Sequence, residues 1–304
     1  MNRHLLVSAL AVTALVQLDA AGLQSRRVAQ PRQTFGQVTV VSNSEGLQQP
    51  ESVLYDAAND VYLVANINGD PSGKDDNGFI SRVSPEGKVL ALKWIDGAAG
   101  DVTLHAPKGM AFRNNLLLVA DIDTIRLFDR NTGKPGGAWP VTGATFLNDV
   151  AVSGNGTVYA TDTAMGSPAN AAIFEFASNQ KQPTPLAKGD ALGAPNGIVI
   201  TPEGPVFVTF SGNRIVRLRG SRATQETVAT LPAGQLDGIE RLGDGSYVVT
   251  SWEAQGVFHV TPDGKAEQFV KGLEGPADLA VDTKRNRIVV PQLLRNEIYI
   301  GPVK

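Results

Sequence analysis

Residues 195–209, PNGIVITPEGPVFVT, contain the pattern that decides the fold of this chain. A proline, a polar residue and a glycine open the stretch, and an alternating apolar run follows. The turn Pro202-Glu203-Gly204 then leads into Val206-Phe207-Val208-Thr209, which is rich in β-branched and aromatic residues. Short runs of this kind, bounded by turn residues, are typical of antiparallel strands. The stretch therefore predicts two neighbouring strands joined by a tight turn.

The same pattern recurs along the chain. Its opening phrase, a Pro or Leu followed by a polar and usually a small residue, begins at six positions: Pro50, Pro107, Leu147, Pro195, Leu236 and Pro276. Each phrase is followed by a turn and a β-rich run, and the repeats continue with a third alternating strand and a more polar fourth one. Four strands at a spacing of about 40–50 residues describe one propeller blade. The sequence thus predicts an all-β fold, a six-bladed β-propeller with four-stranded antiparallel blades.

The two ends of the repeat region predict how the ring closes. The sixth repeat has room for only three strands before the chain ends, and residues 36–41, GQVTVV, form a spare strand ahead of the first repeat. We expect this N-terminal strand to complete blade six, because a closed ring leaves no exposed sheet edge. An open sandwich of two domains is the competing fold, but it does not explain six similar phrases.

The polar residue of each phrase suggests a site. The first strand of a blade lies nearest the axis, so the polar residues form a ring at one mouth of the central tunnel. They are Glu51, Lys108, Asn148, Asn196, Asp237 and, if the last phrase carries one extra residue, Asp278 rather than Ala277. Two carboxylates and two amide oxygens suit a hard cation such as Ca²⁺, which takes 6–8 oxygen ligands. A polar tunnel filled with water and hydrogen-bonded side chains is the alternative.

These phrases give residues 36–304 a resemblance to a known family. The sequence resembles the SMP-30/gluconolactonase group of six-bladed propellers, which has the paraoxonases and diisopropylfluorophosphatase as relatives. The resemblance implies a catalytic Ca²⁺, or another divalent cation, held by Glu51, Asn148, Asn196 and Asp237. It also implies hydrolysis of lactones or, in some members, of phosphotriesters. Asp237 is then the candidate base or nucleophile, or it serves only as a metal ligand.

Lys108 departs from the family pattern, because the paraoxonase branch carries a histidine at the matching position. An ammonium beside a cation weakens cation binding unless it pairs with Asp278 or Glu51. Lys108 is a second catalytic candidate, as a base of lowered pKa or as a binder of an anionic substrate, and in the extreme its ammonium replaces the metal. His105 is a candidate proton shuttle or an ordinary loop residue. Trp252 is expected to pack in the core.

Composition and the N-terminus limit the partners and the compartment. The chain has no cysteine and a net charge of −3, and no Lys/Arg cluster is present, so we expect no nucleic-acid binding. Residues 1–21 have the basic start, apolar run and small-residue end of a signal peptide, with an uncleaved membrane anchor as the alternative. Residues 22–35 are expected to be a loose segment. The mature protein is expected to be a monomer, exported to the periplasm or secreted, with no membrane contact after cleavage.

These observations favour an exported calcium-dependent hydrolase of a small lactone or ester, acting on a small-molecule substrate. A non-catalytic propeller of NHL type, which binds a ligand or a protein without an essential metal, is the alternative. A metal-free isomerase or lyase is a third reading, because a fold alone does not determine chemistry.

Overall fold

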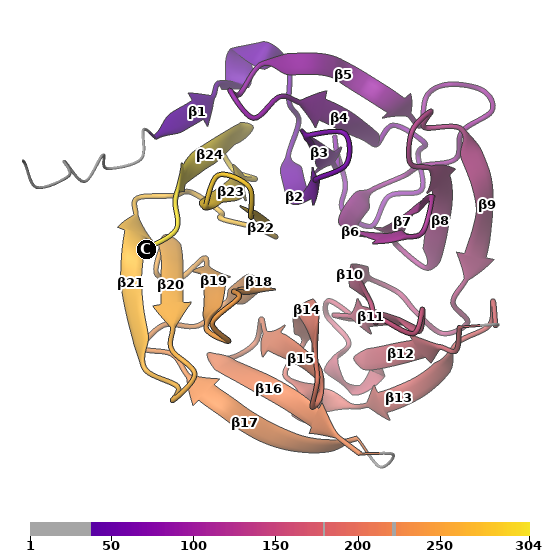
Figure 1. Ribbon diagram of the computed structural model, residues 1–304. Helices are drawn as coiled ribbons and strands as arrows, with labels where there is room; N and C mark the ends of the chain where they lie inside the picture. Colours follow the sequence, from indigo (N-terminus) through magenta and orange to yellow (C-terminus); the bar gives the residue numbers. More distant parts are fainter. Residues whose placement is uncertain (1–37, 179, 221–222) are drawn as a thin grey trace, which may run out of the picture. The chain divides into compact units, whose positions relative to one another are not determined.

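Six four-stranded antiparallel sheets surround a central axis in the computed structural model, which describes residues 38–178, 180–220 and 223–304 (Figure 1). This confirms the predicted six-bladed β-propeller. The predicted signal segment and loose segment, residues 1–35, lie outside the described residues. Within the described ranges, no helix has both the length and the apolar character needed to cross a membrane.

Each blade follows the predicted order of strands, from the axis outward. Blades one to three comprise β2 (Pro50–Asp56), β3 (Val61–Asn66), β4 (Phe79–Val83) and β5 (Val89–Asp96); β6 (Pro107–Arg113), β7 (Leu116–Asp121), β8 (Thr124–Asp129) and β9 (Pro135–Pro140); and β10 (Leu147–Val152), β11 (Val158–Asp162), β12 (Ala172–Phe176) and β13 (Thr184–Lys188). Blades four and five comprise β14 (Pro195–Thr201), β15 (Gly204–Thr209), β16 (Arg214–Arg219) and β17 (Thr224–Thr230); and β18 (Leu236–Arg241), β19 (Tyr247–Ser251), β20 (Gly256–Val260) and β21 (Ala266–Lys271). Three short 3₁₀ helices, η1 (Asn43–Glu45), η2 (Pro168–Asn170) and η3 (Asp190–Leu192), lie in the connections.

Blade six is closed by the N-terminal strand, as the sequence predicts. It comprises β22 (Ala280–Asp282), β23 (Arg287–Gln292), β24 (Glu297–Pro302) and, on its outer edge, β1 (Thr39–Val41). Thr39 pairs with Ile300 and Val41 with Ile298. The first described strand therefore covers the edge that the last strand would otherwise expose.

The recurring phrase is a bulge in the innermost strand of blades one to five. The register between the first and second strands shifts at the phrase in every one of these blades, for example between Pro195 and Ile198 and between Leu236 and Ile239. A bulge leaves an extra residue unpaired and redirects its side chain. The polar residue of the phrase lies in the bulge. Its side chain can therefore face the central axis, whereas regular strand pairing would direct it toward the neighbouring sheet.

The small residue of the phrase is required by close approach between blades. A Cβ atom on Gly197 would lie 2.6 Å from the backbone oxygen of Asp237, and one on Gly238 would lie 2.7 Å from the Cα atom of Asp278. The innermost strands of adjacent blades therefore touch through their backbones near the axis. Farther out, apolar side chains fill the space between blades, as where Val41 and Ile300 pack with Tyr62 and Val64.

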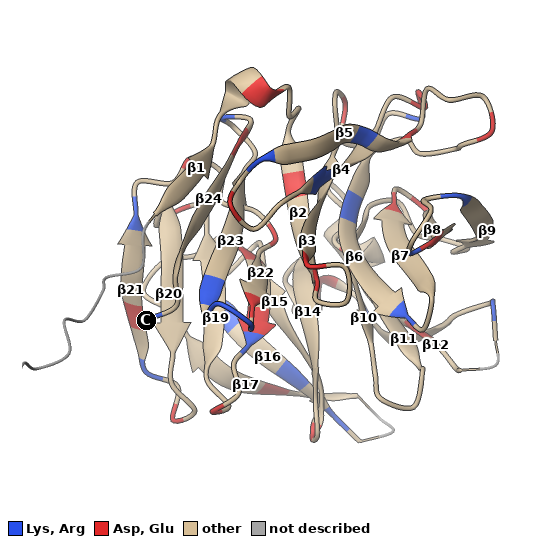
Figure 2. Cartoon of the chain, turned by 45° about the horizontal axis from the view of Figure 1, so that its top comes forward, with Lys and Arg blue, Asp and Glu red and all other residues tan. Residues whose placement is uncertain are grey.

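Charged residues of both signs are interspersed over the strands and loops in the view of Figure 2. That view shows no concentrated basic face. The expectation that the protein does not bind nucleic acid, and that it is a monomer, stays a prediction.

Candidate functional site

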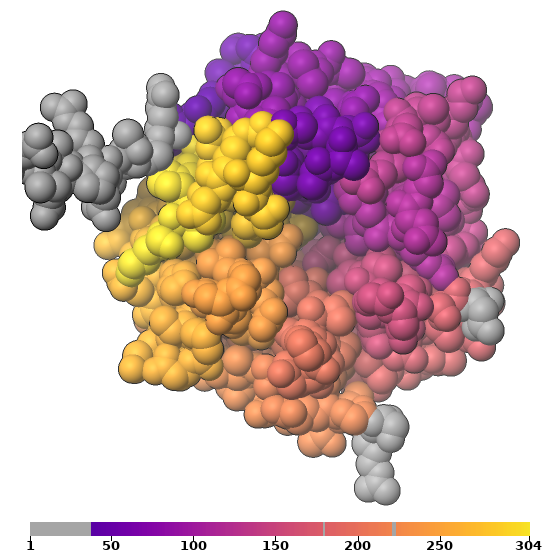
Figure 3. Space-filling model, in the orientation of Figure 1, coloured from indigo at the N-terminus to yellow at the C-terminus, as the bar shows by residue number. Residues whose placement is uncertain are grey.

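A cavity of about 160 Å³ lies where the innermost strands begin. The face shown in Figure 3 is hollowed at its centre, between the blades. Fourteen residues line the cavity, and they come from all six blades: Gln49, Glu51, Ile67, Pro71, Lys108, Phe146, Asn148, Thr163, Met165, Asn196, Phe210, Asp237, Trp252 and Leu293. Most of the polar side chains come from the innermost strands, and most of the apolar ones come from the loops that follow the second strands.

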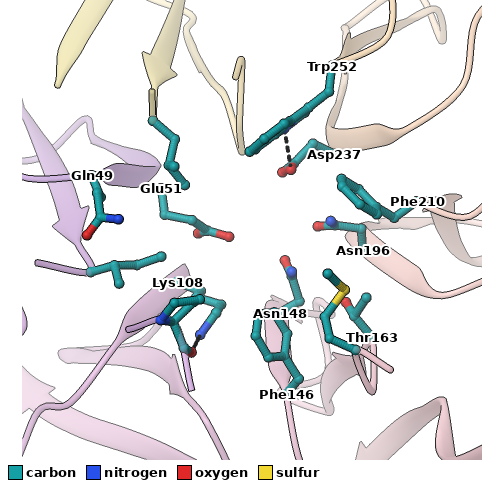
Figure 4. Close-up of a pocket in the computed structure, with 14 residues that line it drawn as sticks. Gln49, Glu51, Lys108, Phe146, Asn148, Thr163, Asn196, Phe210, Asp237 and Trp252 are labelled. Carbon is teal, nitrogen blue, oxygen red and sulfur yellow. Dashed lines mark hydrogen bonds between the residues drawn. The ribbon is translucent and has the colours of Figure 1, made fainter. Parts of the chain in front are cut away.

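The four residues predicted to hold a cation converge in this cavity (Figure 4). Glu51, Asn148, Asn196 and Asp237 are each at most 4% exposed. Each of them has one buried oxygen without a hydrogen-bond partner: Glu51 Oε2, Asn148 Oδ1, Asn196 Oδ1 and Asp237 Oδ1. Buried polar atoms are seldom left unpaired, because losing water without replacement costs about 1–3 kcal/mol each.

A divalent cation would satisfy all four oxygens at once. Carboxylate and amide oxygens are the donors that Ca²⁺ prefers, and water or substrate can complete its 6–8 ligands. No group of three or more His, Cys, Asp or Glu side chains suited to a metal occurs among the described residues. Half of the oxygens in this cluster come from amides. The donor set therefore fits a hard cation and does not fit zinc, which prefers His and Cys.

In the absence of a cation, burial favours the protonated form of the Glu51 and Asp237 carboxyl groups. It raises the pKa of Glu51 well above the usual value, and nearby Asp237 raises it further, whereas Lys108 lowers it. Burial likewise raises the pKa of Asp237, with Asp278 adding to the effect. Trp252 opposes it, because the indole Nε1–H donates a 2.9 Å hydrogen bond to Asp237 Oδ2 (Figure 4). A bound cation would favour the charged form of both acids.

Lys108 lines the cavity but points its ammonium away from the oxygen cluster. Its Nζ donates to the backbone oxygens of Pro71 at 3.0 Å and Ala106 at 3.1 Å, and it lies 4.4 Å from the centre of the Phe146 ring. Lys108 forms no ion pair with any described residue, so the structure does not show the pairing with Asp278 or Glu51 that would offset its repulsion of a cation. Burial lowers the pKa of Lys108, and the charge of Glu51 opposes this.

Asp278 and His105 are near the site without lining the cavity. Asp278 Oδ2 accepts a 2.7 Å hydrogen bond from Ser52, and its backbone pairs with β2, so it joins blade six to blade one. Burial raises the pKa of Asp278 to about 7. His105 is 9% exposed, and its Nδ1 accepts a 3.1 Å hydrogen bond from the backbone N–H of Asp76, in the long loop between β3 and β4. A role of His105 as proton shuttle is not tested by this placement.

Sequence reasoning missed the apolar part of the site. Trp252 was expected to pack in the core, but it lines the cavity and holds Asp237. A signal for this was present: Ile67, Phe210, Trp252 and Leu293 each follow the second strand of a repeat, about 14–16 positions after the polar position of that repeat. The same phase in several repeats indicates the same place at the mouth of the tunnel.

Comparisons with known proteins agree with this architecture. Residues 50–274 match the family model described as SMP-30/Gluconolactonase/LRE-like region. A comparison with curated proteins gives no match.

Solved structures with the same fold include three of differing chemistry. A gluconolactonase from Xanthomonas campestris is 14% identical, with a TM-score of 0.67 over 88% of this chain and 90% of that one. The calcium-binding protein regucalcin from Agrobacterium tumefaciens is 17% identical, with a TM-score of 0.61 over 85% and 92%. Virginiamycin B lyase from Staphylococcus aureus is 12% identical, with a TM-score of 0.63 over 88% and 100%. At these identities the likeness shows the fold, and the chemistry has to be argued from the cavity.

Proposed function

The chain belongs to the SMP-30/gluconolactonase/LRE-like family, and we propose that it is an exported, calcium-dependent hydrolase of a lactone or related ester. The observation that carries the proposal is the set of four buried oxygens without partners, one each from Glu51, Asn148, Asn196 and Asp237. Family membership supports lactonase-type hydrolysis broadly. The oxygen cluster supports the dependence on a cation, because these oxygens have no protein donor to satisfy them.

Glu51, Asn148, Asn196 and Asp237 would hold the cation, which when bound polarises the substrate carbonyl and offsets the charge that develops on its oxygen. Asp237 is the best candidate for handling protons. Its Oδ1 is one of the four oxygens that would hold the cation. The proton of a water that adds to the carbonyl would therefore pass to Oδ2, which accepts a hydrogen bond from Trp252 and keeps a second lone pair. The ring C–O bond then breaks, and the alcohol oxygen recovers a proton. The apolar residues around the cavity exclude bulk water, which strengthens the electrostatic interactions of these groups.

In this proposal Lys108 has a structural role and does not take part in the chemistry. One of its two hydrogen bonds joins the innermost strand of blade two to Pro71, in the long loop between β3 and β4, and Pro71 forms part of the cavity wall. The other hydrogen bond goes to Ala106, directly before that strand. The four oxygens lack partners even with Lys108 in place. This supports a cation in addition to the ammonium and argues against the ammonium as its replacement.

Elemental analysis and hydrolysis assays test the proposal together. We expect about one Ca²⁺ per chain, lost on treatment with a chelator, and chelator-sensitive hydrolysis of members of a lactone panel. Replacing Asp237 by Asn should lower turnover at least about a hundredfold while preserving the fold. Asp263→Asn, on an exposed turn outside the cavity, is the matched control. A chain that binds no divalent cation and hydrolyses no lactone would instead support the non-catalytic binding propeller.

Export requires a separate measurement, because the segment concerned lies outside the described residues. The proposal rests on the basic start, apolar run and small-residue end of residues 1–21. N-terminal sequencing of protein recovered from the periplasm or the medium should give a mature chain beginning after Ala20 or Ala21. A full-length chain retained with the cytoplasm or the membrane would contradict export.

A further inference from the structure

The geometry of the cavity points to a substrate with an apolar alkyl or aryl group beside its lactone or ester, and without the hydroxyl groups of a sugar lactone. This inference rests on the proposed hydrolase function and specifies its substrate class. It depends on the part of the cavity that surrounds the oxygen cluster and not on the cluster itself.

The wall of the cavity is apolar on most sides. Seven of its lining residues are Ile67, Pro71, Phe146, Met165, Phe210, Trp252 and Leu293. Phe210 and Trp252 meet edge to face with ring centres 6.0 Å apart, which gives blades four and five a rigid aromatic corner. Met165 is 55% exposed at the rim, where a flexible thioether can contact an apolar group that enters.

The polar lining residues outside the oxygen cluster are largely occupied by protein partners. Lys108 Nζ donates to two backbone oxygens, and Thr163 Oγ1 donates to the backbone oxygen of Pro195 at 2.8 Å. Gln49 Oε1 accepts from the backbone N–H of Gly69 at 2.6 Å, and the Trp252 indole N–H is taken by Asp237. Gln49 Nε2 has no hydrogen bond to a described residue, and outside the oxygen cluster the described lining offers few other side-chain groups to bind substrate hydroxyls.

This combination discriminates between two kinds of lactone. A polyhydroxylated lactone would lose water from several hydroxyl groups without gaining protein partners for them, which weakens its binding. An alkyl chain would instead transfer apolar surface from water to the aromatic corner. Each methylene that becomes buried should raise kcat/KM about fourfold, until the cavity is filled.

A series of substrates tests the inference with the full mature protein and Ca²⁺. We would compare δ-valerolactone, its 6-propyl and 6-hexyl derivatives, and D-glucono-δ-lactone. We expect kcat/KM to rise with chain length and the hexyl compound to exceed the glucono compound by more than a hundredfold. Equal or better hydrolysis of the glucono compound would overturn the inference while leaving the hydrolase proposal intact.

Two adjacent leucines provide a matched pair of variants. Leu293 lines the cavity, whereas Leu294 is 62% exposed and does not. Leu293→Asn should reduce the preference for the hexyl compound over δ-valerolactone at least tenfold, and Leu294→Asn should leave it unchanged. Phe210→Ser provides a second cavity variant in case Leu293→Asn does not fold. An unchanged preference in both folded cavity variants would contradict the inference.

Binding separates failure of this inference from failure of the proposed function. If no lactone is hydrolysed, the hydrolase proposal fails. Calorimetry with unreactive lactams then still measures whether the cavity prefers apolar ligands to polyhydroxylated ones. We expect 6-hexyl-δ-valerolactam to bind more tightly than the unsubstituted lactam and a polyhydroxylated lactam. The absence of this order would overturn the apolar substrate class on its own.

Discussion

The hydrogen bond between Trp252 and Asp237 allows a sharp test of the site. Trp252→Phe removes the indole N–H but keeps an aromatic ring against Phe210. No other described group donates a hydrogen bond to the side chain of Asp237, so the variant leaves Oδ2 without a protein donor to fix its position.

The size of the effect follows from the bond that is lost. A hydrogen bond to a charged group contributes about 1.5–3 kcal/mol, which corresponds to a roughly ten- to hundredfold decrease in kcat/KM if the bond orients Asp237 for catalysis. The bond also lowers the pKa of Asp237. Its removal raises that pKa, so the carboxylate is lost at a higher pH, and the acidic limb of the activity profile should move upward.

Initial rates of lactone hydrolysis over a range of pH, together with calorimetric titration of Ca²⁺, measure both effects. Trp94→Phe is the control, because Trp94 belongs to the outer strand β5 and lies outside the cavity. An enzyme with Trp252→Phe that keeps kcat/KM within twofold and an unshifted acidic limb would refute the assigned role of this hydrogen bond.

Three further predictions concern the architecture that supports the site. Gly197→Ala should lower stability by about 1–3 kcal/mol in denaturant unfolding, because its Cβ meets the backbone of blade five, whereas Gly154→Ala, with open space around it, should not. A chain that starts at residue 42 loses β1 and exposes β24, so its melting temperature should fall and light scattering should report self-association, unlike a chain that starts at residue 38. Arg130→Ala should lower the free energy of unfolding by about 2–3 kcal/mol at pH 7, because the Arg130 guanidinium donates hydrogen bonds to the buried carboxylate of Asp56 in the adjacent blade. Burial alone raises the pKa of Asp56, but hydrogen bonds from Arg130 and Asn59 lower it more, so this stabilisation is present above pH 4 and the difference between the two proteins should shrink as the pH falls below it. A difference that persists unchanged at pH 2 would contradict the assignment.

The architecture could be predicted from the sequence because the strand and turn pattern of one blade is repeated along the chain. Six phrases, each followed by turns and alternating runs, specify the number of blades, and the spare strand near Val41 specifies the closure. The polar position of each phrase also identified Glu51, Asn148, Asn196 and Asp237 as residues that converge on one cavity. Strand patterning and repeat phase are local properties, and they survive in a single sequence without knowledge of packing.

The hydrogen-bond partners, burial and charge of the side chains in the site depend on contacts between blades. The sequence places Lys108 in the ring of polar residues, but only the tertiary structure shows that its ammonium turns to the carbonyls of Pro71 and Ala106. Likewise, only the tertiary structure shows that Trp252 donates a hydrogen bond to Asp237. The same holds for Asp278, which accepts a hydrogen bond from Ser52, more than 200 residues away in the chain. Periodicity fixes which strand a residue occupies and which face it takes. Its hydrogen-bond partners, its burial and therefore its charge depend on strands brought alongside by closure of the ring, and no local pattern encodes them.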